Sequence, residues 1–592
     1  MYQTIKSMGN SQSGQCERLR DADGNLIRTK QGRMKRRKEY FEKLLNAGEE
    51  LEEEVLEDLK KKPRETDENE PPPHIDEVRA AIKKLKNHKA AGVDGIHAEM
   101  VKAGGETMVK LLHKMLEKIW ILEIVPDDWM KAIVIPLVKK GDATLCENWR
   151  GISLLSVLSK VYTNVILSRL VIATDSKISE IQAGFRRGRG CSDQIFVMRR
   201  LMEQTRRDGK PLYLCFVDLK AAYDTVNRSA LWEVLLEYGI SDKLCRMIKC
   251  LYKATEAAIK CEGEISDWFE VRTGLRQGCL LSPALFNIYM DFVVRLAIGD
   301  MEEYGVKIKY RMPDGRIRDG TLVQGEERLL ALLYADDLVV ICESEEGLSE
   351  CMLRLERFTQ RWGLTISVKK TKKLTTNDEN SEQVPIVIRG ERVEKVSEFQ
   401  YLGSMLTENG SSVKDINRRI SLGAFKFNEL QKPVWSQRNI SLRTKIQIYK
   451  ATVSAIVLYG AESWTCSENE YSRLNAFNTR RLRSILGKKA SEIHNKELYK
   501  ITGMPSYEDL IRKYRLRWAG HVRRLNDCRI PKKLMFGQVV RTGKGKTGRP
   551  KREWTDCLKQ DLEKVGIPLG TWIQNSKDRL KWRKSISSLT PN

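Results

Sequence analysis

The chain has 592 residues, too many for one compact core, so we expect several domains. Lysine and arginine number 104 against 79 aspartate and glutamate, and the formal net charge of +25 indicates an anionic polymer as partner, with nucleic acid the first choice and an anionic membrane surface the second. No apolar run approaches the ~18 residues of a membrane span and the N-terminus lacks the apolar core of a signal peptide, so we expect a soluble, intracellular protein without a membrane partner.

Residues 1–72 are predicted to lie at the periphery of the fold. A short helical patch from Tyr40 to Leu45 precedes a run dense in glutamate and lysine, which indicates an exposed helix and then a proline-stopped linker. From residue 73 onward apolar residues recur at helical spacing, beginning with Val78 and Ile82. The first packed domain is therefore expected to start near residue 73.

The next stretch alternates between strands and helices. A strand is predicted from Ala132 to Val138, followed by a helix from Ile152 to Leu170. Gln182 to Gly190 (QAGFRRGRG) combines arginine with freely turning backbone, a composition that suits phosphate binding and equally a solvated loop. Pro211 to Leu219 alternates as a buried strand, and Asp218 near its end requires a partner because an unpaired acid is costly in an apolar setting.

A long amphipathic helix is predicted from Ala230 to Tyr252. A turn at Gln277 and Gly278 precedes Ser282-Pro283, where serine as N-cap and proline as first helical residue are expected to open another helix. Residues 305–328, rich in glycine, arginine and aspartate, are predicted to be an excursion between that helix and the strands that follow.

Two acidic residues interrupt the apolar stretch from Leu329 to Cys342 (LLALLYADDLVVIC). Apolar runs of strand length flank Asp336 and Asp337, so the carboxylates are predicted at the tip of a buried β-hairpin. Burying adjacent like charges is costly unless a cation lies beside them, and a pair of Mg²⁺ ions is the simplest such cation because Mg²⁺ favours carboxylate oxygens. An exposed Asp-Asp turn in an ordinary hairpin is the alternative, and this stretch alone does not separate the two.

Beyond the hairpin the chain is increasingly basic. Leu364 to Leu374 places lysines beside a predicted strand, and helices with basic faces are expected at 413–430 and 442–459. From about residue 470, tryptophans stand among arginines and lysines, a pattern that suits base stacking with phosphate neutralisation, or a basic surface over an ordinary core. These tryptophans are Trp464, Trp518, Trp554, Trp572 and Trp582. Residues 541–554 are expected to be flexible, with a Gly-Arg-Pro core suited to a minor groove.

Several short motifs together resemble a known family. FVDLKAAYD, RQGCLLSPALFN, LLYADDLVV, GLTISVKKTK and FQYLGS stand in the order of reverse transcriptase blocks, and NWRGISLLSVLSK and QAGFRRGRGCSDQ resemble the finger blocks of non-LTR retrotransposon reverse transcriptases. GHVRR and GRPKREW resemble the tail of the endonuclease-reverse transcriptase lineage, so the resemblance covers residues 25 to 590.

The resemblance implies an α/β (α+β) fold with the right-hand architecture of polymerases. Fingers and palm are expected from residue 73 to 396 and a helical thumb from 397 to 465. Residues 1–72 would be an N-terminal extension and charged linker, and residues 466–592 a basic, mostly helical region that binds nucleic acid.

The resemblance also implies a catalytic centre. Asp218, Asp336 and Asp337 would hold two Mg²⁺ ions, or Mn²⁺ in their place, with the Leu219 carbonyl as a further ligand. Lys370 would be the general acid that protonates the leaving pyrophosphate, although three other lysines within three residues leave this choice open.

A second group would contact the incoming nucleotide. Its members are Lys139, Arg150, Arg186, Ala222, Tyr223, Gln277 and Gly278. The three basic residues would grip the triphosphate by charge-assisted hydrogen bonds. Tyr223 would be a steric gate against a ribose 2′-hydroxyl, with a core tyrosine as the alternative, and the Gln277-Gly278 turn would pack on the nucleotide, with a plain helix-entry turn as the alternative.

The function implied is RNA-directed DNA polymerase, which extends a DNA 3′ end on an RNA template with deoxynucleoside triphosphates. Two alternatives remain, a catalytically silent relic that binds RNA or DNA, and an RNA-templated RNA polymerase, against which Tyr223 argues. The expected partners are template RNA, primer DNA and dNTPs. A separate endonuclease is also expected, because the chain begins after the point where the nuclease of full-length relatives would end. The family implies the nucleus and cytoplasm as locations.

Overall fold

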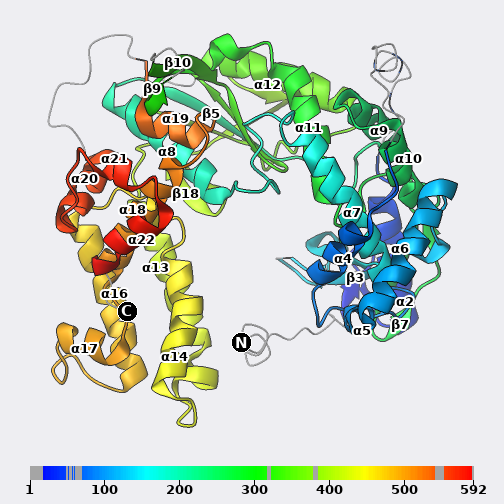
Figure 1. Ribbon diagram of the computed structural model, residues 1–592, viewed down its shortest axis with the longest axis horizontal. Helices are drawn as coiled ribbons and strands as arrows, with labels where there is room; N and C mark the ends of the chain where they lie inside the picture. The colour runs from blue at the N-terminus through cyan, green and yellow to red at the C-terminus, as the bar shows by residue number, and fades with distance from the viewer. Residues whose placement is uncertain are drawn as a thin grey trace.

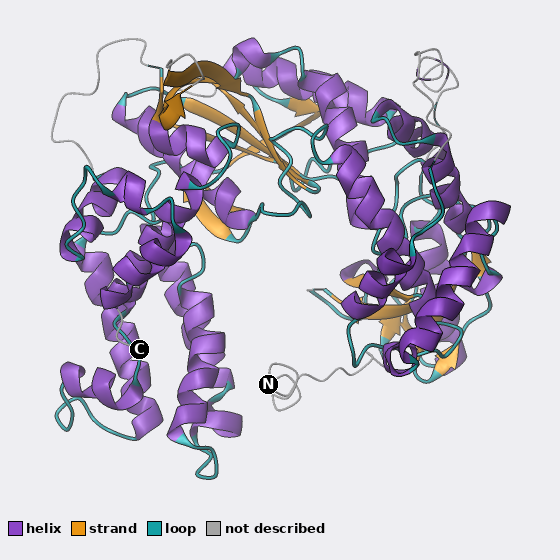
Figure 2. Cartoon of the chain, in the orientation of Figure 1, coloured by secondary structure: helices purple, strands orange, loops and turns teal. Residues whose placement is uncertain are grey.

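The computed structural model describes residues 18–48, 51, 57, 59, 70–139, 141–316, 322–377, 384–540 and 552–589. The described chain forms an arch, with an N-terminal lobe at one end, a sheet at the top and helices at the other end (Figure 1). Strands gather in the N-terminal lobe and at the top of the arch, whereas the remaining limb is helical (Figure 2). This mixed α/β architecture of fingers, palm and helical thumb is the one predicted.

The palm is a sheet with helices on both faces. Its elements are α8 (Cys191–Arg207), β5 (Leu212–Val217), α9 (Arg228–Glu237), α10 (Asp242–Lys249), α11 (Ser282–Ile298), β11 (Ala331–Tyr334), β12 (Asp337–Cys342), α12 (Glu345–Arg361), β13 (Lys372–Thr376) and β16 (Glu394–Lys395). The strand order is β11-β12-β5-β13-β16. Every side chain of the central strand β5 is buried, because Cys215 and Val217 join the core beneath α11 while Leu214 and Phe216 join the core beneath α8.

Smaller strand pairs flank this sheet. They are β14 (Val387–Ile388) with β15 (Glu391–Arg392), and β17 (Glu398–Tyr401) with β18 (Ser404–Thr407). The region predicted as an excursion forms a hairpin of β9 (Val306–Arg316) and β10 (Leu322–Leu329). A strand from the C-terminal region, β19 (Gly537–Val539), adds to β9 and follows helix α19 (Ile530–Phe536) directly. The C-terminal region is thus part of the palm.

The fingers carry a second sheet. Its elements are α4 (Ile75–Lys84), α5 (Ala98–Ala103), α6 (Gly105–Leu122), β3 (Lys131–Val138), β4 (Trp149–Leu154), α7 (Val157–Thr174), β6 (Glu256–Cys261), β7 (Glu264–Ile265) and β8 (Phe269–Glu270). β3 lies between β4 and β6, antiparallel to the first and parallel to the second. The prediction of a helix from residue 152 is therefore wrong for residues 152–154, which belong to β4. α7 begins at Val157, because the Ser156 side chain accepts a hydrogen bond from the Ser159 amide.

The N-terminal segment packs against the fingers, which corrects its expected peripheral position. A two-stranded pair, β1 (Leu19–Arg20) and β2 (Leu26–Ile27), precedes helix α2 (Lys30–Leu44). Phe41 of α2 is buried in a core with Trp149 and residues of β3, β6 and β8. Arg33 and Arg37 both donate to the Glu262 carboxylate, at 2.7 and 3.0 Å, so α2 is tied to the β6-β7 turn by ion pairs as well as by burial.

Helix α7 is the one described helix whose length and composition suit a membrane crossing, and half of it is buried inside the fold. Its residues Val161, Tyr162 and Ile166 belong to the main core, and the Tyr162 hydroxyl donates to the Met247 carbonyl at 2.9 Å. In this structure α7 is therefore a core helix.

Two other helix predictions differ from the structure. The segment predicted as one helix over 230–252 is broken into α9 and α10 at Gly239, which has a φ of 69° that a helix does not allow. Ser282 is not the N-cap of α11: Leu281 takes that position, and the Ser282 hydroxyl donates to the Arg276 carbonyl at 2.8 Å.

The helical limb contains two cores. The first extends from Ile416 to Ile511 and unites α13 (Val413–Glu429), α14 (Leu442–Tyr449), α15 (Ala455–Val457), α16 (Glu468–Leu486) and α17 (Asn495–Thr502). It crosses residue 465, where the thumb was expected to end. The second core contains residues of α18 (Tyr507–Arg523), α20 (Trp554–Lys564), α21 (Trp572–Asn575) and α22 (Arg579–Ser585), together with Phe196 of α8.

The tryptophans expected to stack on bases mostly build these cores. Trp464, Trp554, Trp572 and Trp582 are buried, and Trp518 is partly buried against Phe196. The tryptophans alternate with basic residues because these helices have one apolar and one basic face. The alternative of an ordinary core is therefore correct for the four buried tryptophans. The predicted flexible segment 541–554, with its Gly-Arg-Pro core, lies outside the described residues up to residue 551.

Candidate active site

Two neighbouring strands bring the predicted aspartates together. β12 and β5 are antiparallel, and Leu338 pairs with Val217. One residue further along this register, Asp337 lies opposite Asp218. Side chains opposite each other in an antiparallel pair have Cβ atoms about 4.5–5.5 Å apart. Asp336 belongs to the turn between β11 and β12, so the three carboxylates share one edge of the palm sheet, as the resemblance implied.

The hairpin turn that carries Asp336 is fixed from outside. Ala335 has a φ of 59°, and its amide donates to Gln182 Oε1 at 3.0 Å. The same oxygen accepts the Gly184 amide at 2.9 Å, and the Ala183 amide donates to the Leu333 carbonyl at 2.8 Å. A Cβ on Gly184 would stand 2.3 Å from the Ala335 nitrogen, so only glycine permits this approach. The 182–184 segment is a brace for the catalytic turn.

The acidic groups perturb one another. Burial, followed by repulsion from Asp336 and Asp218, raises the pKa of Asp337 to about 6. Burial and Asp218 also raise the pKa of Asp336, while Arg150 and Lys370 oppose that rise. Asp336 and Asp337 are therefore buried carboxylates beside further negative charge, an environment that a bound cation would relieve.

Lys370 lies at the catalytic edge. Its Nζ donates to Asp218 Oδ2 at 3.1 Å, and its side chain is 70% exposed. The neighbouring backbone holds Asp218 in place, because the Ser367 amide donates to the Asp218 carbonyl at 2.8 Å and the Asp218 amide donates to Thr371 Oγ1 at 3.3 Å. Ser367 thus contributes through its main chain.

The donor set fits Mg²⁺ in its chemistry, since it consists of carboxylates and carbonyl oxygen. Leu219 and Ile366 form an isolated β-bridge. Its hydrogen bonds use the carbonyls of Asp218 and Thr365, so the bridge does not use the Leu219 carbonyl. Among the residues that the structure describes, no group of three His, Cys, Asp or Glu side chains is close enough to hold a metal ion as it stands. Lys370 instead supplies the local positive charge beside Asp218.

The predicted nucleotide gate lies next to these carboxylates. Tyr223 stacks on Phe286, with ring centroids 4.1 Å apart and planes at 17°. Its hydroxyl is buried without a hydrogen-bond partner in the described structure, and burial followed by the Asp336 charge raises its pKa. Ala222 is only 4% exposed, so its side chain belongs to the core and offers no surface to a nucleotide.

The Gln277-Gly278 turn joins the gate to the fingers. Gln277 Nε2 donates to Asp224 Oδ1 at 2.6 Å, while the Gln277 carbonyl accepts the Ser153 amide at 3.1 Å. Gly278 has a φ of 110°, and a Cβ there would lie 2.6 Å from the Ser153 carbonyl oxygen. Burial raises the pKa of Asp224 to about 6. Asp224 was not among the predicted site residues, although its position directly after Tyr223 could have indicated it.

The predicted triphosphate contacts divide into two groups. Lys139, which follows β3, and Arg150, on β4, are exposed, and their charges act on Asp224; Arg150 also acts on Asp336 and on Tyr223. The charge of Arg150 therefore reaches Asp336, one of the predicted metal ligands, whereas the charge of Lys139 reaches Asp224.

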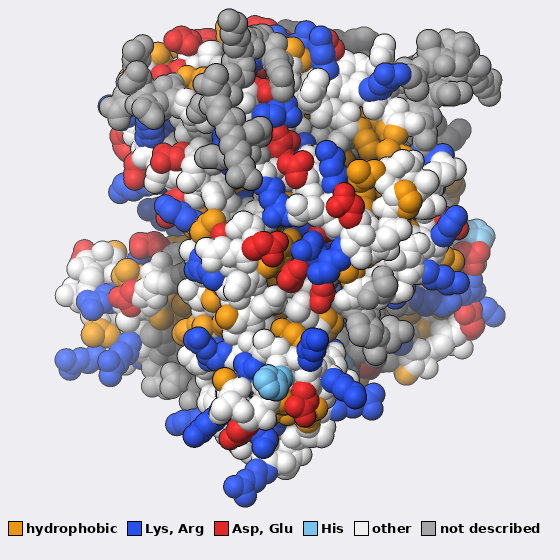
Figure 3. Space-filling model, turned by 90° about the vertical axis from the view of Figure 1, so that its left-hand side faces the viewer, with side chains coloured by type: hydrophobic (Ala, Val, Ile, Leu, Met, Phe, Trp, Pro, Cys, Tyr) orange, Lys and Arg blue, Asp and Glu red, His pale blue; other side chains and the backbone are white. Residues whose placement is uncertain are grey.

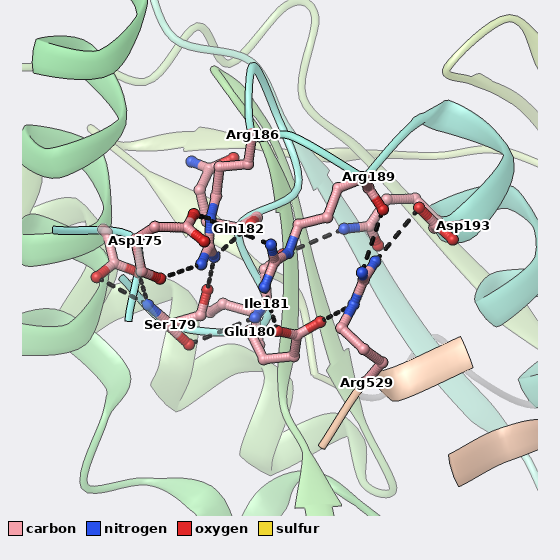
Figure 4. Close-up of polar contacts among 12 residues, drawn as sticks. Asp175, Ser179, Glu180, Ile181, Gln182, Arg186, Arg189, Asp193 and Arg529 are labelled. Atoms are coloured by element: carbon pink, nitrogen blue, oxygen red, sulfur yellow. Dashed lines mark hydrogen bonds and ion pairs between the residues drawn. The ribbon is translucent and has the colours of Figure 1, made fainter. Parts of the chain in front are cut away.

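Arg186 does not join them. It is 8% exposed, and its guanidinium donates to the Asp175 carboxylate at 2.9 Å and to the carbonyls of Ser179 and Gln182 at 2.7 and 3.0 Å (Figure 4). Since these partners occupy the guanidinium N–H groups, the structure assigns Arg186 to the brace. This corrects the prediction that Arg186 binds the triphosphate.

The brace is in turn tied to the C-terminal region. Arg529 forms an ion pair with the Glu180 carboxylate, donates to the Gly188 carbonyl at 3.1 Å and lies 3.5 Å from an oxygen of Asp193. Arg189 also reaches Glu180, at 2.6 Å (Figure 4). No local pattern near Gln182 or Arg529 predicts this network, because its partners are more than 300 residues apart in sequence.

Comparison with known proteins finds one matching family model and several relatives of low identity. Residues 138–406 match the family model described as reverse transcriptase (RNA-dependent DNA polymerase). The chain is 24% identical over 499 residues to a probable RNA-directed DNA polymerase from transposon BS of Drosophila melanogaster, covering 80% of this chain and 51% of that protein. It is 22% identical over 430 residues to the RNA-directed DNA polymerase from mobile element jockey of Drosophila funebris, covering 70% and 44%. The chain thus spans about half the length of these relatives.

Among solved structures, apo telomerase from Candida tropicalis aligns with 72% of this chain and 73% of its own, at 13% identity and a TM-score of 0.36.

Proposed function

We propose that residues 138–406, which match the reverse transcriptase family model, form a reverse transcriptase domain of the non-LTR retrotransposon type. The chain would extend a DNA 3′ end on an RNA template, using deoxynucleoside triphosphates. The observation that carries the proposal is the convergence of Asp218, Asp336 and Asp337 on one edge of the palm sheet beside Lys370. Three mutually repelling carboxylates at a strand edge are an arrangement for binding divalent cations, and their neighbours are cations suited to phosphates.

Asp218, Asp336 and Asp337, with the Leu219 carbonyl, would hold two Mg²⁺ ions, and Mn²⁺ would fit the same oxygen donors. Bound there, the ions would lower the pKa of the primer 3′-hydroxyl and neutralise the triphosphate. Lys370 then loses its role as counter-ion to Asp218 and becomes available to the leaving group. In the reaction the primer 3′-hydroxyl would lose its proton to solvent and its oxygen would form a bond to the α-phosphorus. The bond from that phosphorus to the bridging oxygen would break, and Lys370 would donate a proton to the leaving pyrophosphate.

Arg150 and Lys139 would bind the triphosphate, because both are exposed and both already act on the acidic groups of the site. Their charge-assisted hydrogen bonds would orient the nucleotide over Tyr223. The stack on Phe286 holds the Tyr223 ring in a fixed plane. A ribose 2′-hydroxyl above that ring would be excluded, so the site selects deoxynucleotides. Gln277 would act through Asp224, beneath the gate, as a positioning residue.

Primer extension tests the proposal. Purified full-length chain, a DNA primer annealed to an RNA template, dNTPs and Mg²⁺ should yield cDNA. Asp336→Asn should abolish the product, because the substitution removes a metal-binding charge with little change in volume. Asp300→Asn is the matched control, since Asp300 is exposed and pairs with Arg354 on the far end of α11 and α12. Equal cDNA yield from Asp336→Asn and Asp300→Asn would refute the metal assignment.

The same assay separates the two alternatives. An RNA-templated RNA polymerase would incorporate rNTPs as well as dNTPs into the product, whereas the gate predicts a strong preference for dNTPs. A silent relic would bind the template without any extension by the wild-type chain. The complete element would also need a nuclease to nick its DNA target, and we propose that a separate endonuclease supplies the 3′ end, in the nucleus, after synthesis of the chain in the cytoplasm.

A further inference from the structure

Two helices of the C-terminal region enclose a basic cavity remote from the aspartates. The cavity has a volume of about 850 Å³ and lies between α18 and α22. Its cationic lining residues are Lys513, Arg517, Arg524, Arg579 and Arg583, and His521 also lines it. Figure 3 views the molecule from the side of the helical limb and shows Lys and Arg side chains recurring across that face.

The spacing of these residues explains why they converge. Lys513, Arg517 and His521 follow one another at intervals of four along α18, so they share one face of that helix. Arg579 and Arg583 have the same spacing on α22 and are exposed. The apolar face of each helix is buried in the core that contains Leu516 and Trp582, which leaves the basic faces to line the cavity.

Three of the lining arginines lack the acidic partners that other arginines of α18 have. On the opposite side of α18, Arg512 and Arg515 bind the Asp561 carboxylate at 2.8 and 2.5 Å. Arg517, Arg579 and Arg583 form no ion pair with any acid in the part of the chain that the structure describes. Glu462, which accepts a hydrogen bond from the Ser192 hydroxyl, is the acidic residue in the lining. Lysine and arginine outnumber it there, so the cavity carries a net positive charge.

The ionisable groups respond to this charge. Burial, followed by Arg517 and Arg583, lowers the pKa of Lys513. Burial, followed by Arg524, Arg529 and Arg579, lowers the pKa of His521. An anion in the cavity would relieve this repulsion and raise both pKa values.

The cavity also offers aromatic surface. Tyr514 and Trp518 belong to its lining, and the Trp518 and His521 ring centroids are 5.4 Å apart. The indole N–H of Trp518 is buried and has no hydrogen-bond partner in the described residues. Cations around partly buried aromatic rings are the combination that binds unpaired nucleic acid, because phosphates meet arginines while bases stack. The volume lies within the ~300–1,000 Å³ of ordinary ligand pockets, which suits a short strand and not a duplex.

We propose that this cavity binds a short unpaired segment of nucleic acid, with backbone phosphates on Arg517, Arg579 and Arg583 and a base beside Trp518. The inference deepens the proposed function, which it presupposes, by adding a strand-binding site outside the catalytic domain. The cavity is connected to the palm through Glu462. This lining residue accepts a hydrogen bond from Ser192, which lies in the first turn of α8, the helix that packs on the palm sheet.

The test uses the full chain without dNTPs and a short labelled oligonucleotide, supplied as single-stranded RNA, as single-stranded DNA of the same sequence, and as duplex. Binding is followed by fluorescence anisotropy across a salt series for Arg579→Ser/Arg583→Ser and for the control Lys496→Ser/Lys500→Ser. The control removes the same charge from exposed positions on α17. Thermal melting of both variants checks that the fold is retained.

The pocket variant should bind a single strand about tenfold more weakly at 0.15 M salt, and its slope of log K against log salt should fall by about 1.4, because each lost phosphate contact on a single strand is worth about 0.7. The strand with the larger loss, RNA or DNA, is the ligand of the cavity. Arg579→Lys/Arg583→Lys, which keeps the charge, should recover most of the affinity.

Unchanged affinity of the pocket variant for both single strands would overturn the proposal. So would an equal loss in the α17 control, or a loss confined to duplex. Primer extension is measured in parallel on the wild-type chain. If wild type binds single strands through these arginines yet never extends a primer, the proposed function fails while the cavity assignment stands.

Discussion

The contacts of Gln182 with the turn that carries Asp336 yield a prediction. It distinguishes a residue that only stabilises the fold from one that also positions the site. Gln182 is fully buried, and its side-chain oxygen accepts the amides of Ala335 and Gly184. Gln182→Leu keeps the volume but leaves both amides without that partner in a dry environment. Each unsatisfied buried donor costs about 1–3 kcal/mol. The loss falls on the turn that carries Asp336, so the turn should loosen before the sheet does.

A matched control lies one element away. Gln194 is also buried and donates to the Ile181 carbonyl at 3.1 Å. That carbonyl also accepts the Leu333 amide, so Gln194→Leu leaves no main-chain group there unsatisfied. The prediction is a fall of at least about tenfold in kcat for Gln182→Leu, since about 1.4 kcal/mol at the transition state is tenfold in rate, and a much smaller fall for Gln194→Leu.

Single-nucleotide primer extension under saturating dNTP, together with thermal melting, measures both effects. Mg²⁺ dependence is included, because a displaced Asp336 should raise the Mg²⁺ concentration needed for half-maximal rate. If Gln182→Leu lowers the melting temperature but leaves kcat and the Mg²⁺ requirement at wild-type values, Gln182 supports the fold alone and the reasoning about the turn is wrong.

Three further predictions follow from the same geometry. Tyr223→Ala should increase rNTP incorporation at least tenfold relative to dNTP, whereas Tyr223→Phe should keep the preference because the hydroxyl has no partner in the described structure; equal selectivity of both variants in a competition assay would argue against the gate. Apparent Mg²⁺ affinity should weaken as pH falls below about 6, because Asp337 must lose its proton to bind metal. In metal-free protein, the raised pKa of Asp337 should make the free energy of unfolding fall as pH rises from about 4 to 6. Mg²⁺ titrations and thermal melts at pH 5 and 7.5 measure the two effects, and a flat response in both contradicts the assignment. Arg529→Ala should slow extension more than Lys532→Ala, since only Arg529 reaches Glu180 and Asp193; similar rates for the two would disconnect the C-terminal region from the brace.

The sequence predicted those parts of the site that depend on local pattern. Apolar runs on both sides of Asp336-Asp337 specify a hairpin, and the alternation that ends at Asp218 specifies a buried strand, so local pattern is enough to place each carboxylate at the end of a strand. Lys370 and Tyr223 were identified by the resemblance, and the structure brings both to the same edge.

What the sequence did not predict depends on contacts between distant segments. Arg186 has the composition of a phosphate ligand, but the carbonyls of Ser179 and Gln182 fold back onto it, and no pattern announces that. The pairing of β19 with β9 joins residues more than 200 positions apart. The break at Gly239 was hidden because apolar spacing continues on both sides of it.

Basic regions are the hardest to interpret from sequence, because a helix with one basic face has the same composition whether it binds a polymer or only covers a core. Trp554 and Trp582 are buried in the core. Arg579 and Arg583, on the neighbouring surface, have no acidic partners among the described residues. Only the packing of α18 against α22 distinguishes the two roles.

The rate of first-nucleotide addition on an RNA template tests the central claim most directly. Asp218→Asn removes the carboxylate that follows β5, and Asp337→Asn removes the carboxylate that begins β12. Each should reduce this rate at saturating dNTP by roughly a thousandfold, about 4 kcal/mol, because metal-ion stabilisation of the transition state is worth several kcal/mol. Rates for either variant within threefold of wild type, at the same Mg²⁺ concentration, would contradict the assignment of these carboxylates to catalysis.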